Sequence, residues 1–181
     1  METIESERIR LRPFTLEDGE FVVELLNTAG WIRYIGDRNI KTTDQAKNYL
    51  LNGPLKSYER NGFGLSLAEL KTEGTPIGMC GLLKRDYLAH ADIGFAFLPD
   101  YTGKGYAYEI AKEIIRYGLQ RLQMEKILAI TLPENFSSIK LLEKIGFRCE
   151  KNFISPDTAE ELSLYSLDNK NFDQLHGKLN G

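Results

Sequence analysis

Apolar and polar positions follow two periods along the chain, and their order predicts a mixed fold. Strand-like alternation or short apolar runs occur at residues 8–14, 63–70, 76–85, 90–98, 127–132, 147–154 and 161–167. Helical spacing predicts a helix capped by Thr15 and Asp18, one over 43–58 interrupted around Gly53–Pro54, one through 107–122 and one over 135–145. The expected fold class is α/β (α+β), with a mixed, mostly antiparallel sheet of about seven strands, about four flanking helices and a single domain over residues 1–181.

Composition narrows the classes of function. The 181 residues are 42% hydrophobic and 27% charged, which is typical of a soluble globular protein. The net charge of −3 argues against nucleic acid as the main partner, because backbone binding needs a basic face. No apolar run approaches the roughly 18 residues of a membrane helix, and the N-terminus is acidic, unlike a signal peptide. We therefore expect a cytoplasmic protein without membrane or nucleic-acid partners.

Two cysteines are too few and too far apart for a disulfide framework or a zinc site. Cys80 and Cys149 belong to no CxxC pair and have no histidine nearby. Both fall in strand-like runs, which predicts two buried, reduced thiols and no metal.

The strongest motif is the glycine loop Thr102-Gly103-Lys104-Gly105-Tyr106-Ala107, between a strand and a long helix. The first-turn amides of a helix lack intrahelical partners and carry partial positive charge, and glycine lets an anion approach them closely. Walker A is excluded because Gly105 follows Lys104, and the dinucleotide pattern is excluded because Tyr108 stands at its third glycine. The loop therefore predicts an anion site, although two glycines could also serve only a tight turn.

Three segments in register resemble the GCN5-related N-acetyltransferase (GNAT) superfamily. The loop matches the family's Arg/Gln-x-x-Gly-x-Gly/Ala signature except at Thr102, residues 92–99 resemble the strand leading into it, and 135–147 resemble the Asn-x-x-Ser…Gly-Phe helix. Residues 10–13 and 31–36 are similar to the RimJ/RimL-type ribosomal-protein branch.

The resemblance implies a sheet splayed at its centre, with acetyl-CoA bound in the splay as co-substrate. The residues expected to supply backbone amides to its pyrophosphate are Thr102, Gly103, Lys104, Gly105, Tyr106 and Ala107. The residues expected to pair with the pantetheine arm are Phe95, Ala96 and Phe97, and Asn135 and Ser138 match positions near the thioester and pantetheine. Lys104 and Lys140 add local positive charge.

Acetyl transfer to an amine requires a base for the amine, a donor for the oxyanion and an acid for the thiolate. The resemblance places a Tyr acid where Leu142 stands, so Ser138 is the substitute candidate; its hydroxyl could equally satisfy the helix backbone. Asp92 is the candidate base, or else a solvated acid at a strand end. We expect His90 in an exposed turn and His176 in a polar tail.

The resulting hypothesis is an N-acetyltransferase that moves the acetyl group of acetyl-CoA to a primary amine, in a ternary complex. The RimJ/RimL resemblance favours a peptide or protein N-terminal α-amine. Two alternatives stay open: a small-molecule acceptor such as a polyamine, amino acid or antibiotic, and a non-catalytic CoA-binding module. The sequence is compatible with a monomer or a homodimer.

Overall fold

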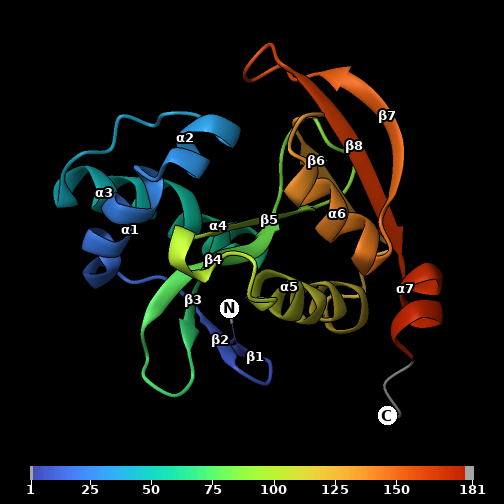
Figure 1. Ribbon diagram of the computed structural model, residues 1–181, viewed down its shortest axis with the longest axis horizontal. Coiled ribbons are helices and arrows are strands. Elements are labelled where there is room, and N and C mark those ends of the chain that lie inside the picture. The colour runs from blue at the N-terminus through green and yellow to red at the C-terminus, as the bar shows by residue number, and fades with distance from the viewer. Residues whose placement is uncertain (1, 178–181) are drawn as a thin grey trace.

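One sheet of eight strands organises the computed structural model, which describes residues 2–177 (Figure 1). The strands are β1 (Ile4–Glu5), β2 (Ile9–Arg12), β3 (Leu65–Leu70), β4 (Pro76–Leu83), β5 (Asp92–Phe97), β6 (Lys126–Thr131), β7 (Arg148–Ile154) and β8 (Glu161–Asp168). Their order is β1-β2-β3-β4-β5-β6-β8-β7, and only β5 and β6 pair in parallel. The mixed, mostly antiparallel fold class is confirmed. All seven predicted strands are present; the eighth, β1, is two residues long and has no sequence signal.

Seven α-helical segments flank the sheet. They are α1 (Gly19–Leu26), α2 (Ala29–Tyr34), α3 (Thr43–Leu50), α4 (Lys56–Asn61), α5 (Tyr106–Arg116), α6 (Phe136–Ile145) and α7 (Asn169–His176). The predicted interruption near Gly53–Pro54 is a π-helical turn at Leu51–Leu55, which separates α3 from α4 while the chain stays helical. Proline lacks an N–H and its ring crowds the preceding turn, and the wider π turn accommodates both effects. Across residues 2–177, the helices are too short or too polar to traverse a lipid bilayer.

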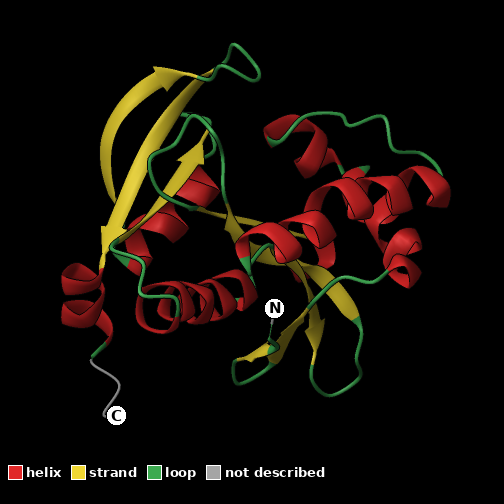
Figure 2. Cartoon of the chain, turned by 180° about the vertical axis from the view of Figure 1, so that it is seen from behind, coloured by secondary structure: helices red, strands yellow, loops and turns green. Residues whose placement is uncertain are grey.

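The two faces of the sheet carry two separate cores, because successive strand residues point to opposite faces. On one face, Ala68 and Cys80 pack with the apolar sides of α5, α6 and α7. On the other, Leu67 and Met79 pack with α1, α2 and α3. Figures 1 and 2 show α1–α4 gathered at one end of the molecule and α5–α7 at the other. Strands β3 and β4 thereby contribute side chains to both cores.

The predicted polar tail around His176 is instead the end of helix α7. Asp168 caps the helix by accepting a hydrogen bond from the Asn171 amide at 2.8 Å, and Phe172 is fully buried. His176 Nε2 lies 2.8 Å from the carbonyl of Ile145, the last residue of α6. His176 therefore joins two helix ends and lies at the opposite end of α6 from the residues of the candidate site.

The two cysteines differ in exposure. Cys80 is buried, and burial raises the pKa of its thiol to about 12. Cys149 is exposed, so the prediction of a buried thiol is wrong there. The reason is its position: β7 is the edge strand, and its register with β8 shifts between Cys149 and Lys151.

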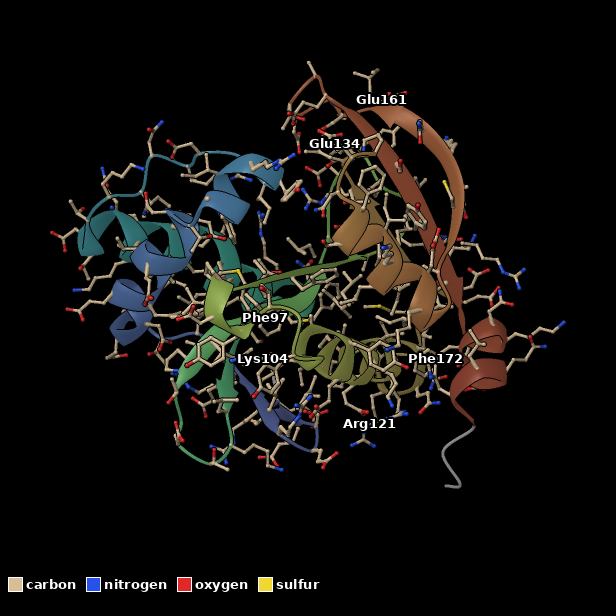
Figure 3. The ribbon with its side chains drawn as sticks, in the orientation of Figure 1. Phe97, Lys104, Arg121, Glu134, Glu161 and Phe172 are labelled. Atoms are coloured by element: carbon tan, nitrogen blue, oxygen red, sulfur yellow. The ribbon has the colours of Figure 1, made fainter. Side chains whose placement is uncertain are left out.

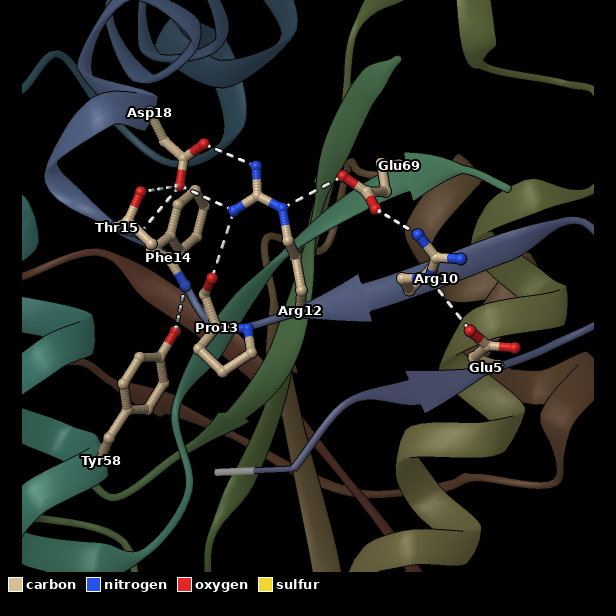
Figure 4. A network of polar contacts seen from close by, with 9 residues as sticks. All are labelled: Glu5, Arg10, Arg12, Pro13, Phe14, Thr15, Asp18, Tyr58 and Glu69. Atoms are coloured by element: carbon tan, nitrogen blue, oxygen red, sulfur yellow. Dashed lines mark hydrogen bonds and ion pairs between the residues drawn. The ribbon is translucent and has the colours of Figure 1, made fainter. Parts of the chain in front are cut away.

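A network of charged side chains ties β2 to the N-terminus of α1 and to β3 (Figure 4). The Arg12 guanidinium donates two hydrogen bonds to Asp18, at 2.9 and 2.7 Å, and a third to Glu69 at 3.1 Å. Asp18 also accepts from the Thr15 amide at 2.8 Å, which confirms the predicted Thr15–Asp18 cap. The carboxylates of Asp18 and Glu69 are each only 8% exposed; Arg12 is the cation that they share, and Glu69 also pairs with Arg10 at 3.1 Å.

We expect Arg12→Met to lower the free energy of unfolding by about 2–3 kcal/mol, because it leaves the buried Asp18 carboxylate without a cation and Glu69 with Arg10 alone. Burial raises the pKa of Asp18, but its bonds to Arg12 and Thr15 outweigh that effect and hold the pKa below its usual value. The stabilisation that the Asp18–Arg12 pair provides is therefore complete above the unfolded-state pKa of Asp18, about 4. It disappears as pH falls through the lower pKa that Asp18 has in the folded state.

Urea unfolding at pH 7 and pH 3 measures both effects. The matched control is Lys126→Met, which breaks a surface pair with Glu150 at 3.2 Å and should cost under about 1 kcal/mol. Equal costs for the two variants, or a cost for Arg12→Met that does not shrink at pH 3, would contradict the assignment.

Candidate active site

The sheet opens between its two parallel strands. β5 and β6 share one bridged pair, Asp92 with Leu128, next to a hydrogen bond of 2.9 Å from the Leu128 amide to the Ala91 carbonyl. Beyond this pair the strands diverge, while β5 stays paired with β4 as far as Phe97 (Figure 1). One edge of β5 therefore lacks a neighbouring strand along most of its length. This is the central splay that the family resemblance implied.

Strand alternation decides which backbone groups face the opening. The Leu98 amide donates to the Ile77 carbonyl of β4 at 2.9 Å, so residues of the same parity as Leu98, including Ala96, direct their backbone groups toward β4. Phe95 and Phe97 have the other parity and direct their N–H and C=O groups toward the open edge. Of the three residues predicted to face the pantetheine arm, these two carry the exposed hydrogen-bonding groups. The Ala96 backbone is engaged by Met79.

The glycine loop follows β5 and opens α5. Gly103 and Gly105 have φ values of +72° and +84°, in the left-handed region that disfavours residues with a Cβ, and Gly105 is the N-cap of α5. A Cβ built at Gly103 would meet nothing within 4 Å. The Thr102 hydroxyl donates to the Pro99 carbonyl at 2.8 Å, which shapes the turn before the loop. The Thr102 hydroxyl is thus engaged within the turn, where the family has an Arg or Gln side chain. The groups that the loop offers to an anion are its backbone amides.

Arg8 holds this loop from a distant part of the chain. Its backbone amide and its Nε each donate to Glu109 at 2.7 Å, and its Nη2 donates to the Lys104 carbonyl at 3.3 Å. Its guanidinium also lies 4.4 Å from the centre of the Tyr106 ring. Burial alone raises the pKa of Glu109, but the hydrogen bonds from Arg8 keep it below its usual value. Arg8 was missed by the sequence analysis because its partner lies 101 residues away.

The loop side chains form a second layer of contacts. The Lys104 ammonium lies 5.6 Å from the centre of the Tyr101 ring, and the Tyr101 and Tyr106 rings are 6.3 Å apart. Figure 3 shows Lys104 at the start of α5 and Phe97 close by at the end of β5. Strand edge and glycine loop are therefore adjacent parts of one surface.

The N-terminus of α6 faces the opening from the β6 side. Asn135 is its N-cap, with its side-chain oxygen accepting from the Ser138 amide at 3.2 Å. Within residues 2–177 the Ser138 hydroxyl makes no hydrogen bond, so the alternative that it satisfies the helix backbone is not observed. Leu142, at the family's Tyr position, is 1% exposed in the core. Among the described residues the hydroxyls of Ser137 and Ser138 are both free of hydrogen bonds, and Ser138 is the partly buried one.

Asp92 lies at the point where the strands part, and it is buried. Its carboxylate is 1% exposed and both oxygens are 3.1 Å from Arg85 Nε. Burial raises the pKa of Asp92 to about 6 against the opposing charge of Arg85. The alternative of a solvated acid at a strand end is wrong, because the Asp92 side chain is buried and paired with Arg85 from the loop between β4 and β5. At neutral pH the carboxylate is mostly ionised and is enclosed with its cation.

A small apolar cluster covers the sheet beyond Asp92. Leu88, Leu128 and Leu164 are buried together, and the rings of Tyr87 and Phe153 lie 6.3 Å apart beside them. His90, in the turn before β5, is half-buried rather than exposed. Across the described residues, no three His, Cys, Asp or Glu side chains are grouped as metal ligands would be. The site thus offers the buried Asp92 carboxylate, the partly buried Ser138 hydroxyl and many backbone groups.

These parts fit one kind of ligand. An unpaired strand edge binds an extended chain that carries amides, and a glycine-lined helix start binds a phosphate or pyrophosphate. The two lie in sequence along β5, the loop and α5. Acetyl-CoA joins both features in one molecule.

Comparison with known proteins identifies a family and its relatives. A family model described as an acetyltransferase (GNAT) domain matches residues 8–148. YnaD of Bacillus subtilis, an uncharacterised N-acetyltransferase, is 30% identical over 150 residues, which cover 83% of this chain and 85% of that protein. The spermidine N(1)-acetyltransferase of Escherichia coli is 26% identical over 143 residues, covering 78% and 74%. The solved structure of RimL, a ribosomal L7/L12 alpha-N-protein acetyltransferase in complex with coenzyme A, has a TM-score of 0.80 at 12% identity, covering 92% of this chain and 98% of that one.

We expect Gly103→Glu to abolish acetyl-CoA binding, because it places a carboxylate among the amides that would face the pyrophosphate. The side chain meets no atom within 4 Å of its Cβ position, so the protein should fold at a cost of about 1–2 kcal/mol for the positive φ. Isothermal titration with acetyl-CoA measures the effect.

Gly74→Glu is the matched control. Gly74 lies in the β3–β4 hairpin with a φ of +66° and equally open surroundings. This variant should bind acetyl-CoA as the wild type does. Equal affinities for both variants would remove the loop from the binding site.

Proposed function

Because the chain belongs to the acetyltransferase (GNAT) family, we propose that it acetylates the α-amine at the N-terminus of a peptide or protein. Membership of this family makes the chain an acetyl-CoA-dependent N-acyltransferase. This activity does not match the alternative of a non-catalytic CoA-binding module. The acceptor is what the proposal adds, and the observation that carries it is the buried Asp92–Arg85 pair. The resemblance of residues 10–13 and 31–36 to the RimJ/RimL-type branch agrees with this acceptor.

In this proposal β5 and its loop hold acetyl-CoA. Phe95 and Phe97 pair their backbone groups with the pantetheine amides, as an added strand would. The amides from Thr102 to Ala107 face the pyrophosphate, with Arg8 keeping the loop in shape. Acetyl-CoA supplies the acetyl group as a thioester. Ala96 lies between Phe95 and Phe97 on β5. Asn135 caps α6, and Ser138 lies in the first turn of that helix.

Ser138 is the proposed acid. Its hydroxyl has no partner among residues 2–177 and lies at the start of α6, on the side of the splay opposite β5. It would give a proton to the sulfur as the carbon–sulfur bond breaks and the new carbon–nitrogen bond forms. Leu142 cannot take this role, because it is apolar and buried.

Asp92 is the proposed final acceptor of the amine proton. Because its side chain is 1% exposed, the proton must reach it through water. A base with a pKa of about 6 is about 2 pKa units below an α-ammonium and more than about 4 below an alkylammonium. The smaller gap makes an α-amine the better match.

The rival acceptor is a polyamine, which the name of the Escherichia coli relative suggests. Each amine of a polyamine is an alkylamine, almost wholly protonated at neutral pH. Such an acceptor would require a stronger or more accessible base than the buried Asp92–Arg85 pair. The two acceptors can therefore be separated by their pH dependence.

We expect kcat/KM for an alanine-starting peptide to exceed that for spermidine by at least about tenfold at pH 7. The reason is that the neutral fraction of an α-amine is then about two orders of magnitude larger. The advantage should narrow by roughly tenfold at pH 9, where a larger share of the alkylamine is neutral. Thiol release measures both, and the Nα-acetylated peptide is the blank. Equal or faster turnover of spermidine at pH 7 would overturn the proposed acceptor.

The variant Asp92→Asn/Arg85→Met tests the base. Removing both charges avoids leaving a buried guanidinium unpaired. With the peptide, wild-type kcat/KM should rise with pH through about 6, as the Asp92 carboxylate forms. The double variant should fold and bind acetyl-CoA but lose most of its turnover and the part of the rise centred near pH 6, keeping only the rise that follows deprotonation of the peptide α-amine. An unchanged profile would remove Asp92 from the reaction.

Ser138→Ala should lower kcat by about 10²-fold and change the Kd of acetyl-CoA less than about threefold, because a general acid acts in the transition state. Ser137→Ala is the control: Ser137 is its exposed neighbour on the same turn and should keep wild-type kinetics. If Ser138→Ala changes kcat no more than Ser137→Ala does, Ser138 is not the acid.

A further inference from the structure

Four lysines gather on α5, α6 and the loop without carboxylate partners. They are Lys104, Lys112, Lys140 and Lys144, and within residues 2–177 none forms an ion pair. The chain as a whole is acidic, with a net charge of −3. An excess of positive charge on one side of such a chain indicates a local requirement for an anion.

One aromatic ring brings two of these charges together. The Lys144 ammonium of α6 lies 4.4 Å from the centre of the Tyr108 ring, and the Lys112 ammonium of α5 lies 6.0 Å from it. Lys112 is one turn beyond Tyr108 on α5, and Lys140 is one turn before Lys144 on α6. We call Tyr108, Lys112, Lys140 and Lys144 the two-helix lysine cluster. It converges from two helices that pack together.

The nearest carboxylates on α5 are already engaged by arginines. Glu109 is bound by Arg8, and Glu113 pairs with Arg116. The two ammonium groups beside one ring also repel each other. An anionic ligand between them would reduce that repulsion.

From this cluster we infer a second phosphate subsite, which takes the 3′-phosphate of CoA. The inference rests on the proposed acetyl-CoA site. Tyr108 lies in the first turn of α5, three residues after Gly105, a rise of about 4.5 Å along the helix axis. The cluster therefore starts one turn from the pyrophosphate loop, and in CoA a single ribose separates the 3′-phosphate from the pyrophosphate. A phosphomonoester carries about −1.5 to −2 charges at neutral pH, which suits two ammonium groups.

The test compares acetyl-CoA with acetyl-dephospho-CoA, which differs only at the 3′-phosphate. The full-length protein and the variant Lys112→Gln/Lys144→Gln are titrated with both compounds at one ionic strength. The control, Lys56→Gln/Lys170→Gln, removes the same net charge from two exposed lysines on α4 and α7. The ratio of the two Kd values is the readout, because a structural effect on the pyrophosphate loop would change both values alike.

We expect the wild type and the control to prefer acetyl-CoA by roughly tenfold, and the Lys112/Lys144 variant to lose most of that preference. A wild type that binds both compounds equally, or a preference that survives in the Lys112/Lys144 variant, would overturn the subsite and leave the proposed function standing. Binding of neither compound by the wild type would overturn the proposed acetyl-CoA site, and the subsite with it.

Discussion

The site depends on one constraint, which is that β5 and β6 pair at Asp92 and Leu128 and then part. Backbone N–H and C=O groups inside a protein need partners, and a strand edge without a neighbour leaves them to a ligand. Two cores keep the edge open, because β5 is fixed to β4 while β6 is fixed to β8. The Asp92–Arg85 pair lies where the strands diverge, so the same point of the fold carries both the opening and a buried carboxylate.

Charge is distributed around this opening in a way that the net charge conceals. Helix-terminal amides hold an anion without a basic surface, which suits a chain of net charge −3. Arg8 turns its charge inward to Glu109 and the loop carbonyl of Lys104. The lysines of α5 and α6 stay unpaired nearby, on the two helices that flank the splay.

Much of this was predictable, and the exceptions have physical reasons. The strands and the glycine loop carry local signals, namely alternation and a strand-to-helix context. The burial of Asp92 depends on tertiary packing, and the Arg8–Glu109 contact joins segments 101 residues apart, so neither has a local signal. Helix α7 did have a local signal, because Asp168 is a typical N-cap residue and Phe172 follows it on the helix. The polar composition of this segment obscured that signal. Pro54 indicates an interruption by propensity, but only the structure shows that a π turn makes it and keeps the chain helical.

The central claim is that the open edge of β5 pairs with acetyl-CoA, and amide hydrogen exchange resolved by residue tests it most directly. Addition of acetyl-CoA should slow exchange at the amides of Phe95 and Phe97 and along the glycine loop. The Ala96 amide, already directed at β4, should change little. Equal protection of all three amides, or protection confined to another edge such as β7, would contradict the account.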